Sequence, residues 1–270
     1  MFQKKRKNLR KKGNLKISNI HLVYGDAHAH PDFDNNRADL IAKLILDIRP
    51  TVVVNIGDNA DMSSLSSFDK GLRQFYGRNY KEDINSHLDF EERVWEPLRR
   101  QKKKLPFRVF CIGNHEYRIE RALDKSPELS GAISLNDLDL PRYYDEIVGY
   151  KGYGTPGEID IDGIIYAHYQ IAGISGKPLN SVHQGYTLLQ KKHKSSTVGH
   201  QHIFSYDVQA IENNKFIHGL CLPCMTDYPV DWAGGVADLW NRGVVIKRNV
   251  DHGNYDIQYV SIESLKKNYG

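Results

Sequence analysis

Histidine, aspartate and asparagine side chains are grouped in a few short segments of this 270-residue chain. The segment "YGDAHAHPD" at residues 24–32 contains two histidines and two aspartates, and "IGDN" (56–59), "IGNHE" (112–116) and "GHQH" (199–202) add others. Carboxylate, imidazole and amide groups without a thiolate are typical ligands of divalent ions such as Mn, Fe or Zn. One such ion needs three or four protein ligands. The sequence offers seven candidates, which predicts two ions: Asp26, His28, Asp58, Asn114, His168, His200 and His202.

The first three of these segments follow predicted strands. Apolar runs at residues 17–24, 51–56 and 106–112 are typical of buried strands. Between the first two, apolar residues at helical spacing predict a helix that Pro50 ends: Leu40, Ile41, Leu44, Ile45 and Ile48. This alternation indicates an α/β fold with parallel strands. Because ligands bind at the carboxyl ends of the strands in such sheets, the seven candidate side chains could converge there.

The second half of the chain has a different pattern. Residues 158–168, 206–220 and 243–262 each contain two short apolar runs around a polar turn, which predicts three β-hairpins. We therefore expect a mainly antiparallel C-terminal half, with residues 205–270 forming hairpins. Residues 62–104 are polar and partly helical in pattern, as in an insertion.

Composition limits the class of protein. A mean hydropathy of −0.55 and the lack of a long apolar run predict a cytoplasmic protein without a membrane partner. Residues 1–12 carry seven Lys or Arg and no acid, so residues 1–17 are expected to form a basic, flexible tail that either contacts a polyanion or is simply solvated. Three cysteines give no disulfide framework. Cys221 and Cys224 in "CLPC" have redox or zinc spacing but lack a second pair, which favours packing.

Five motifs in order resemble the calcineurin-like metallophosphoesterase superfamily. They are Gly25-Asp26-Ala27-His28, Gly57-Asp58-Asn59-Ala60-Asp61, Gly113-Asn114-His115-Glu116, His168, and Gly199-His200-Gln201-His202. The resemblance covers about residues 20–205. It implies a four-layer sandwich in which two packed mixed β-sheets are flanked by helices, here as one domain at residues 18–270.

The resemblance also implies a role for each site residue. One metal would be held by Asp26, His28, Asp58 and His202, and the other by Asp58, Asn114, His168 and His200, with Asp58 bridging. His115 would protonate the leaving oxygen, and Asp61 would orient His115. Outside the motifs, Arg118 and His30 are candidates for substrate contact, although Arg118 also suits a surface salt bridge. Manganese is the expected metal, with Fe, Zn or Ni as alternatives.

The implied activity is hydrolysis of a phosphate ester by a hydroxide that bridges the two metals. Arginine and aromatic residues alternate at residues 73–80, and together with the basic tail they favour a phosphodiesterase or nuclease acting on nucleic acid or nucleotides. Two alternatives stay open. A phosphomonoesterase acting on phosphoprotein or a small metabolite fits the "GNHE" motif, although "GDNADMSS" lacks the arginine of protein phosphatases. A non-catalytic binding module with the same fold is the other.

Overall fold

The computed structural model describes residues 19–270 except residues 153, 173–175 and 213–214. Its first sheet has six strands in the order β11-β10-β1-β2-β3-β4. Strands β1 to β4 are parallel, whereas β10 pairs antiparallel with β1, and β11 with β10. The bounds are β1 His21–Tyr24, β2 Val52–Asn55, β3 Phe107–Cys111, β4 Glu146–Val148, β10 Gly243–Asp251 and β11 Asn254–Ser261. The carboxyl ends of β1, β2 and β3 therefore lie at one edge of this sheet.

The second sheet has five strands in the order β5-β6-β7-β9-β8. The pairs β5–β6 and β8–β9 are antiparallel, and β7 lies parallel between β6 and β9. The bounds are β5 Ile159–Ile161, β6 Ile164–Tyr166, β7 Ser196–Val198, β8 Ser205–Ile211 and β9 Lys215–Cys221. The β5–β6 turn has positive φ at both Asp162 and Gly163, as two-residue hairpin loops prefer.

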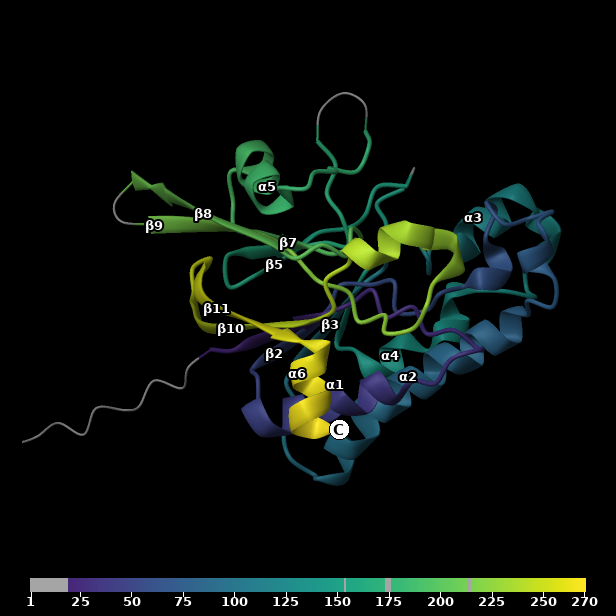
Figure 1. The fold of residues 1–270 in the computed structure, drawn as a ribbon, viewed down its shortest axis with the longest axis horizontal. Helices are drawn as coiled ribbons and strands as arrows, with labels where there is room; N and C mark the ends of the chain where they lie inside the picture. The colour runs from purple at the N-terminus through teal and green to yellow at the C-terminus, as the bar shows by residue number, and fades with distance from the viewer. Residues whose placement is uncertain (1–18, 153, 173–175, 213–214) are drawn as a thin grey trace, which may run out of the picture.

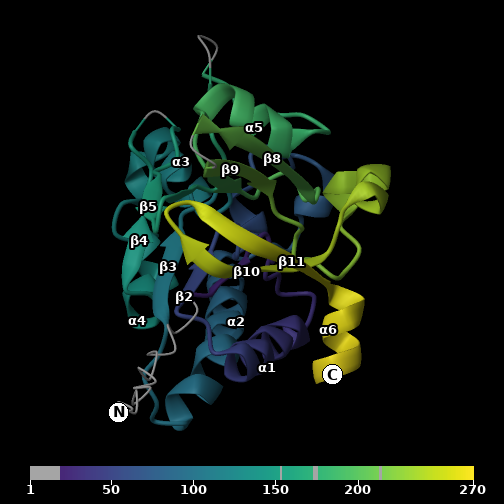
Figure 2. The same ribbon diagram turned by 90° about the vertical axis from the view of Figure 1, so that its left-hand side faces the viewer.

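Helices cover the outer faces of the two sheets. In Figure 1, α1, α2 and α6 lie on one side of the β10–β11 sheet and α5 lies on the far side of β8 and β9; Figure 2 shows the same four layers from the side. The bounds are α1 Asn36–Ile48, α2 Tyr80–Arg100, α3 Arg118–Lys125, α4 Leu140–Tyr143, α5 Gln184–Lys192 and α6 Ile262–Tyr269.

The central strands are apolar on both faces because both faces are covered. On β1, Leu22 and Tyr24 pack in the core under the helices, while Val23 packs in the core between the sheets. On β2, Val53 faces the helices and Val54 faces the second sheet. A strand that is buried on both sides reads as a continuous apolar run, and this is the pattern from which these strands were predicted.

The predicted α/β architecture of two mixed sheets flanked by helices is confirmed for the described residues. The three predicted hairpins are β5–β6, β8–β9 and β10–β11. The expectation of a mainly antiparallel second half was incomplete, because α5 connects β6 to β7 as a crossover and makes that pair parallel. Helix α6 follows the last hairpin and had not been predicted.

The other expectations from composition concern membrane-spanning helices, the basic tail and the cysteines. No helix in the described residues is both long and apolar enough to cross a membrane. The basic tail expected at residues 1–17 lies outside the described residues. Cys221 is buried against Leu188 and Val198 beneath α5, and Cys224 is buried beside Val230 and Trp240, so both cysteines pack as expected.

Candidate metal centre

Most candidate ligands lie in strained backbone at the ends of strands. Five of the seven have φ in the left-handed region: Asp26 (49°), His28 (46°), Asp58 (49°), His200 (72°) and His202 (59°). For a residue other than glycine this conformation costs about 1–2 kcal/mol. Such strain persists only where the surrounding structure enforces it, and it concentrates at functional sites. The loops after β1, β2 and β7 are therefore held in shape by their neighbours.

The loop after β1 is held through its carbonyl groups. The carbonyl of Asp26 accepts a hydrogen bond from Thr226 Oγ1 (2.7 Å), and the carbonyl of Ala27 accepts one from Arg37 Nη2 (2.8 Å). The carbonyl of His28 accepts one from the Tyr228 hydroxyl. Arg37 is fully buried, and its guanidinium lies over the rings of Phe90 and Tyr228. Sequence reasoning missed these residues. Two of the three donors lie 200 positions from their acceptors, and no local pattern signals such contacts.

The turns after β2 and β3 are joined by one buried carboxylate. Glu116 accepts hydrogen bonds from the backbone N–H groups of Asp58 (3.0 Å), Ala60 (2.9 Å) and Gly113 (2.9 Å). The two turns approach so closely that a Cβ at Gly113 would overlap Asp58. Gly57 has φ 96°, so it supplies a left-handed turn, whereas Gly113 is required by this close approach.

The first group of ligand atoms comes from the loops after β1 and β7. His202 Nε2 lies 3.4 Å from Asp26 Oδ1 and 3.3 Å from His28 Nε2. His28 Nδ1 lies 3.0 Å from Asp61 Oδ1 and can donate its hydrogen to it, and this tautomer leaves a lone pair on His28 Nε2. Side-chain atoms of Asp26, His28 and His202 all lie within 4.8 Å of one another and are buried.

The second group comes from the ends of β2, β3, β6 and β7. His168 donates from Nδ1 to the carbonyl of Ile56 (2.9 Å), so in the neutral ring Nε2 is an acceptor. That nitrogen lies 3.2 Å from Asp58 Oδ2 and 3.1 Å from Asn114 Oδ1. Atoms of Asp58, His168 and His200 also lie within 4.8 Å of one another. The structure thus brings all seven candidate residues into two adjoining groups.

The chemistry of these donors fits divalent cations. In each group, acceptor atoms face one another at about hydrogen-bond distance, an arrangement that a cation between them stabilises. Burial alone would raise the pKa of the Asp58 carboxyl, but His168 and His115 beside it hold that pKa well below its usual range. Burial lowers the pKa of His28 and His200 to about 4. The carboxylate is therefore charged and these two imidazoles are neutral at neutral pH, which are the forms that bind metal.

The carboxylates around His168 favour positive charge at its ring. Burial acts to lower its pKa, yet the surrounding carboxylates, Asp58 first, raise it to about 9. A cation is thus favoured among Asp58, Asn114 and His168. Together the two groups are consistent with a dinuclear metal site.

His115 and Asp61 lie beside the two groups. His115 Nδ1 lies 2.6 Å from the backbone carbonyl of Asp61 and 3.4 Å from its carboxylate, so Asp61 contacts the ring through both groups. The same carboxylate is the one that contacts His28. Arg118 donates to the carbonyls of Asp61 (2.9 Å) and Met62 (3.2 Å), and its Nη2 lies 3.2 Å from His115 Nε2. Arg118 therefore faces the site and not a carboxylate on the surface.

Asp61, His115 and Arg118 line an open cleft of about 530 Å³. Its walls include Asp58, His115, Arg118 and the exposed ring of Phe68, which is 81% exposed. His30 lies outside this cleft, in a neighbouring hollow beside Asp61, where its ring is near Phe33 and Tyr228. Of the two candidates for substrate contact, Arg118 therefore lines the cleft beside the ligand residues, whereas His30 lines the neighbouring hollow.

The aromatic and arginine residues at 73–80 are used in different ways. Arg78 pairs with Asp69 at 2.7 Å, and Tyr80 donates to Asp137 at 2.7 Å, so both are engaged within the protein. Tyr76 is 95% exposed. Phe68, which sequence reasoning did not single out, lines the cleft itself. A single exposed aromatic residue in a loop has no sequence signal that distinguishes it from others.

A buried polar network supports the turn after β2 from behind. His87 on α2 donates from Nε2 to the carbonyl of Leu138 (3.1 Å), and its Nδ1 lies 3.3 Å from the Asn59 amide nitrogen. The Asn59 amide also donates to Glu91 (3.1 Å), which accepts from Tyr144. His87 is fully buried, and burial lowers its pKa to about 4.

Comparison with known proteins finds distant similarity in structure alone. No family model matches the chain, and no curated protein matches it. A solved archaeal phosphodiesterase is 12% identical and matches at a TM-score of 0.41, covering 89% of this chain and 99% of its own. The phosphoesterase YfcE from E. coli is also 12% identical and matches at a TM-score of 0.36, covering 90% of this chain and 99% of its own. At TM-scores this low, neither match indicates what this chain does, so its chemistry is inferred from its own residues.

Proposed function

We propose that this protein is a phosphoester hydrolase that uses two divalent metal ions and belongs to the calcineurin-like metallophosphoesterase superfamily. The observation that carries the proposal is the convergence of seven buried or half-buried ligand residues from the ends of five strands. Asp26, His28 and His202 would hold one ion, and Asn114, His168 and His200 the other. Asp58 would bridge the two, because its carboxylate offers two oxygens.

Two bound ions would neutralise phosphoryl oxygens and lower the pKa of a coordinated water. Manganese is the ion we propose, since the ligands combine carboxylate, imidazole and amide; iron, zinc and nickel are the alternatives. The other steps fall to the chain's own residues. His115 is held at Nδ1 by the Asp61 carbonyl, so when its ring carries a second proton, at Nε2, that nitrogen can deliver it to the leaving oxygen, a contribution of about 10²–10⁴ in rate. Arg118 Nη2, beside that nitrogen, can pair with a phosphate oxygen.

Within this reaction class we propose a phosphodiester substrate, a nucleotide or nucleic acid. The cleft is open to solvent, and Phe68 on its wall can stack a nucleobase, a contact worth about 1–3 kcal/mol per base. Binding of nucleic acid would weaken steeply with salt, because counterions are released when phosphates are contacted. A phosphomonoesterase on phosphoprotein or a small metabolite is the alternative that the test must separate.

The test compares hydrolysis of bis-p-nitrophenyl phosphate and p-nitrophenyl phosphate by metal-stripped protein reloaded with Mn²⁺. The substrates share a leaving group and differ in whether phosphorus carries two esters or one. We expect faster hydrolysis of the diester, and loss of both activities in Asp58→Asn but not in Asp124→Asn, an exposed position on α3. Preference for the monoester would refute the diester assignment. Metal binding without turnover of either ester would refute the enzyme assignment and favour a binding module.

A further inference from the structure

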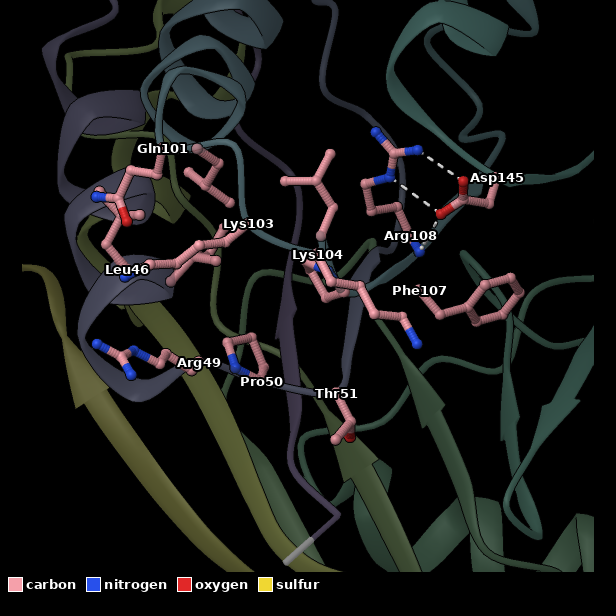
Figure 3. Close-up of a pocket in the computed structure, with 14 residues that line it drawn as sticks. Leu46, Arg49, Pro50, Thr51, Gln101, Lys103, Lys104, Phe107, Arg108 and Asp145 are labelled. Atoms are coloured by element: carbon pink, nitrogen blue, oxygen red, sulfur yellow. Dashed lines mark hydrogen bonds and ion pairs between the residues drawn. The ribbon is translucent and has the colours of Figure 1, made fainter. Parts of the chain in front are cut away.

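A second cleft lies at the opposite edge of the first sheet from the metal centre. The metal-binding loops follow the carboxyl ends of β2 and β3, whereas this cleft includes Thr51, just before β2, and Phe107, the first residue of β3. Its volume is about 610 Å³, which is within the range of small-molecule sites. Figure 3 shows its walls, which are the last turns of α1 and α2, the segment that enters β3, and Asp145.

The interior of the cleft is apolar. Ile45 and Leu98 are buried in its floor, and Leu46 and Leu105 are half-buried beside them. Phe107 is 43% exposed at the rim, a large apolar side chain left in water. A ligand with an apolar body would therefore remove apolar surface from water, which favours binding.

The rim of the cleft is cationic. Arg49, Lys103 and Lys104 line it and are exposed, and no ion pair is found for them among the described residues. The carboxylate in the lining, Asp145, is already engaged, because Arg108 contacts both of its oxygens at 2.6 and 3.0 Å. In Figure 3 the dashed lines join Arg108 to Asp145, and none reaches the other three cations.

Two helices end at this cleft, and their C-termini carry partial negative charge. Each contributes roughly half an elementary charge. Arg49, Lys103 and Lys104 contribute three positive charges, so the rim keeps a net charge of about +2. An anionic group placed over the apolar floor would meet these cations.

We propose that this cleft binds a small anionic amphiphile, with its apolar body on the floor and its phosphate, sulfonate or carboxylate group against Lys103, Lys104 and Arg49. This site is independent of the metal centre and of the activity proposed there. The "RRQKKK" segment at residues 99–104, which reads in sequence as the solvated end of a helix, supplies two of the three cations. Charge argues against the chain's own basic residues 1–12 as the occupant, because cations would meet cations.

The experiment uses 8-anilinonaphthalene-1-sulfonate, an anionic aryl probe that fluoresces when it is removed from water. It is titrated into the full chain and into the double variant K103E/K104E, with K191E/K194E as the matched charge reversal on exposed lysines at the end of α5. We expect binding to weaken about tenfold in K103E/K104E, because two attractions become repulsions at exposed sites. Binding by K191E/K194E should match the unmodified chain within about twofold. Circular dichroism verifies that all three proteins are folded.

Competition tests the apolar floor and the alternative ligands. Dodecyl phosphate should displace the probe at a concentration at least about a hundredfold below that of inorganic phosphate, since its methylene groups leave water on binding. Equal potency of the two, or equal probe binding by K103E/K104E and the unmodified chain, would refute the proposal. Salt-sensitive displacement by a single-stranded oligonucleotide would instead identify a polyanion site. Sedimentation with anionic phospholipid vesicles that K103E/K104E abolishes would identify a membrane surface. Either result overturns the assignment to a small amphiphile.

Discussion

Replacing His87 with glutamine should remove a defined part of the pH dependence of stability. His87 Nε2 donates to the carbonyl of Leu138, and Nδ1 faces the amide nitrogen of Asn59, which is a donor. The neutral ring satisfies both contacts, because it has one donor and one acceptor. A second proton would place two donors against each other in a buried site, which agrees with a pKa lowered to about 4.

The size and sign of the effect follow from that pKa. Between pH 4 and 6.5 the unfolded chain binds more protons at this position than the folded chain, so stability rises with pH in this window. The contribution is fully present above pH 6.5 and is lost as pH falls towards 4, at about 1.4 kcal/mol per pH unit. Over the whole window the loss is about 3 kcal/mol.

The assay is urea unfolding of metal-free protein at several pH values from about 4 to 7. The quantity of interest is the difference in unfolding free energy between the unmodified chain and His87→Gln, because other titrating groups are present in both proteins and cancel. This difference should shift by about 3 kcal/mol across the window. A pH-independent difference for His87→Gln would refute the reasoning.

Three further predictions concern the metal centre. Asp58→Asn should lose both metals together, measured by elemental analysis, because its carboxylate is proposed to serve both ions; two retained ions would contradict the bridging role. His115→Ala should keep both metals and lose about 10²–10⁴ in rate on alkyl esters but much less on p-nitrophenyl esters, and an equal loss on both would argue against a proton donor. Arg37→Met should leave the buried Ala27 carbonyl without its charged donor and lower the free energy of unfolding by about 1–3 kcal/mol, together with metal affinity. Unchanged thermal stability and metal affinity in Arg37→Met would show that the loop does not depend on this contact.

The sequence predicts those parts of the fold and site that depend on local pattern. Val23 and Val54 belong to apolar runs whose length identifies strands, and the candidate ligands follow those strands directly. The parallel β7–β9 pair was not predictable, because its partners are separated by the β8 hairpin strand and no periodicity encodes which neighbour a strand selects.

The supporting residues of the site could not be predicted for the same physical reason. Glu116 is adjacent to His115 in sequence, yet its role follows from three backbone groups on two separate turns. Thr226 and Tyr228 act on a loop 200 positions earlier. Such contacts depend on how the sheets and helices pack, and a single sequence contains no record of that packing.

The pairing of β1 with β10 affects the order in which the protein can assemble on the ribosome. Residue 21 pairs with residue 247, and the loop that follows β1 is closed by residues 226 and 228. A growing chain therefore carries Asp26 and His28 through about 200 further residues of synthesis before the residues that fix them emerge. Contacts of such high sequence separation form slowly, since a long loop must close first. The proposed ions can thus be captured in their final geometry only after residues 226, 228 and 247 have emerged from the ribosome, so metal loading should follow the synthesis of β10.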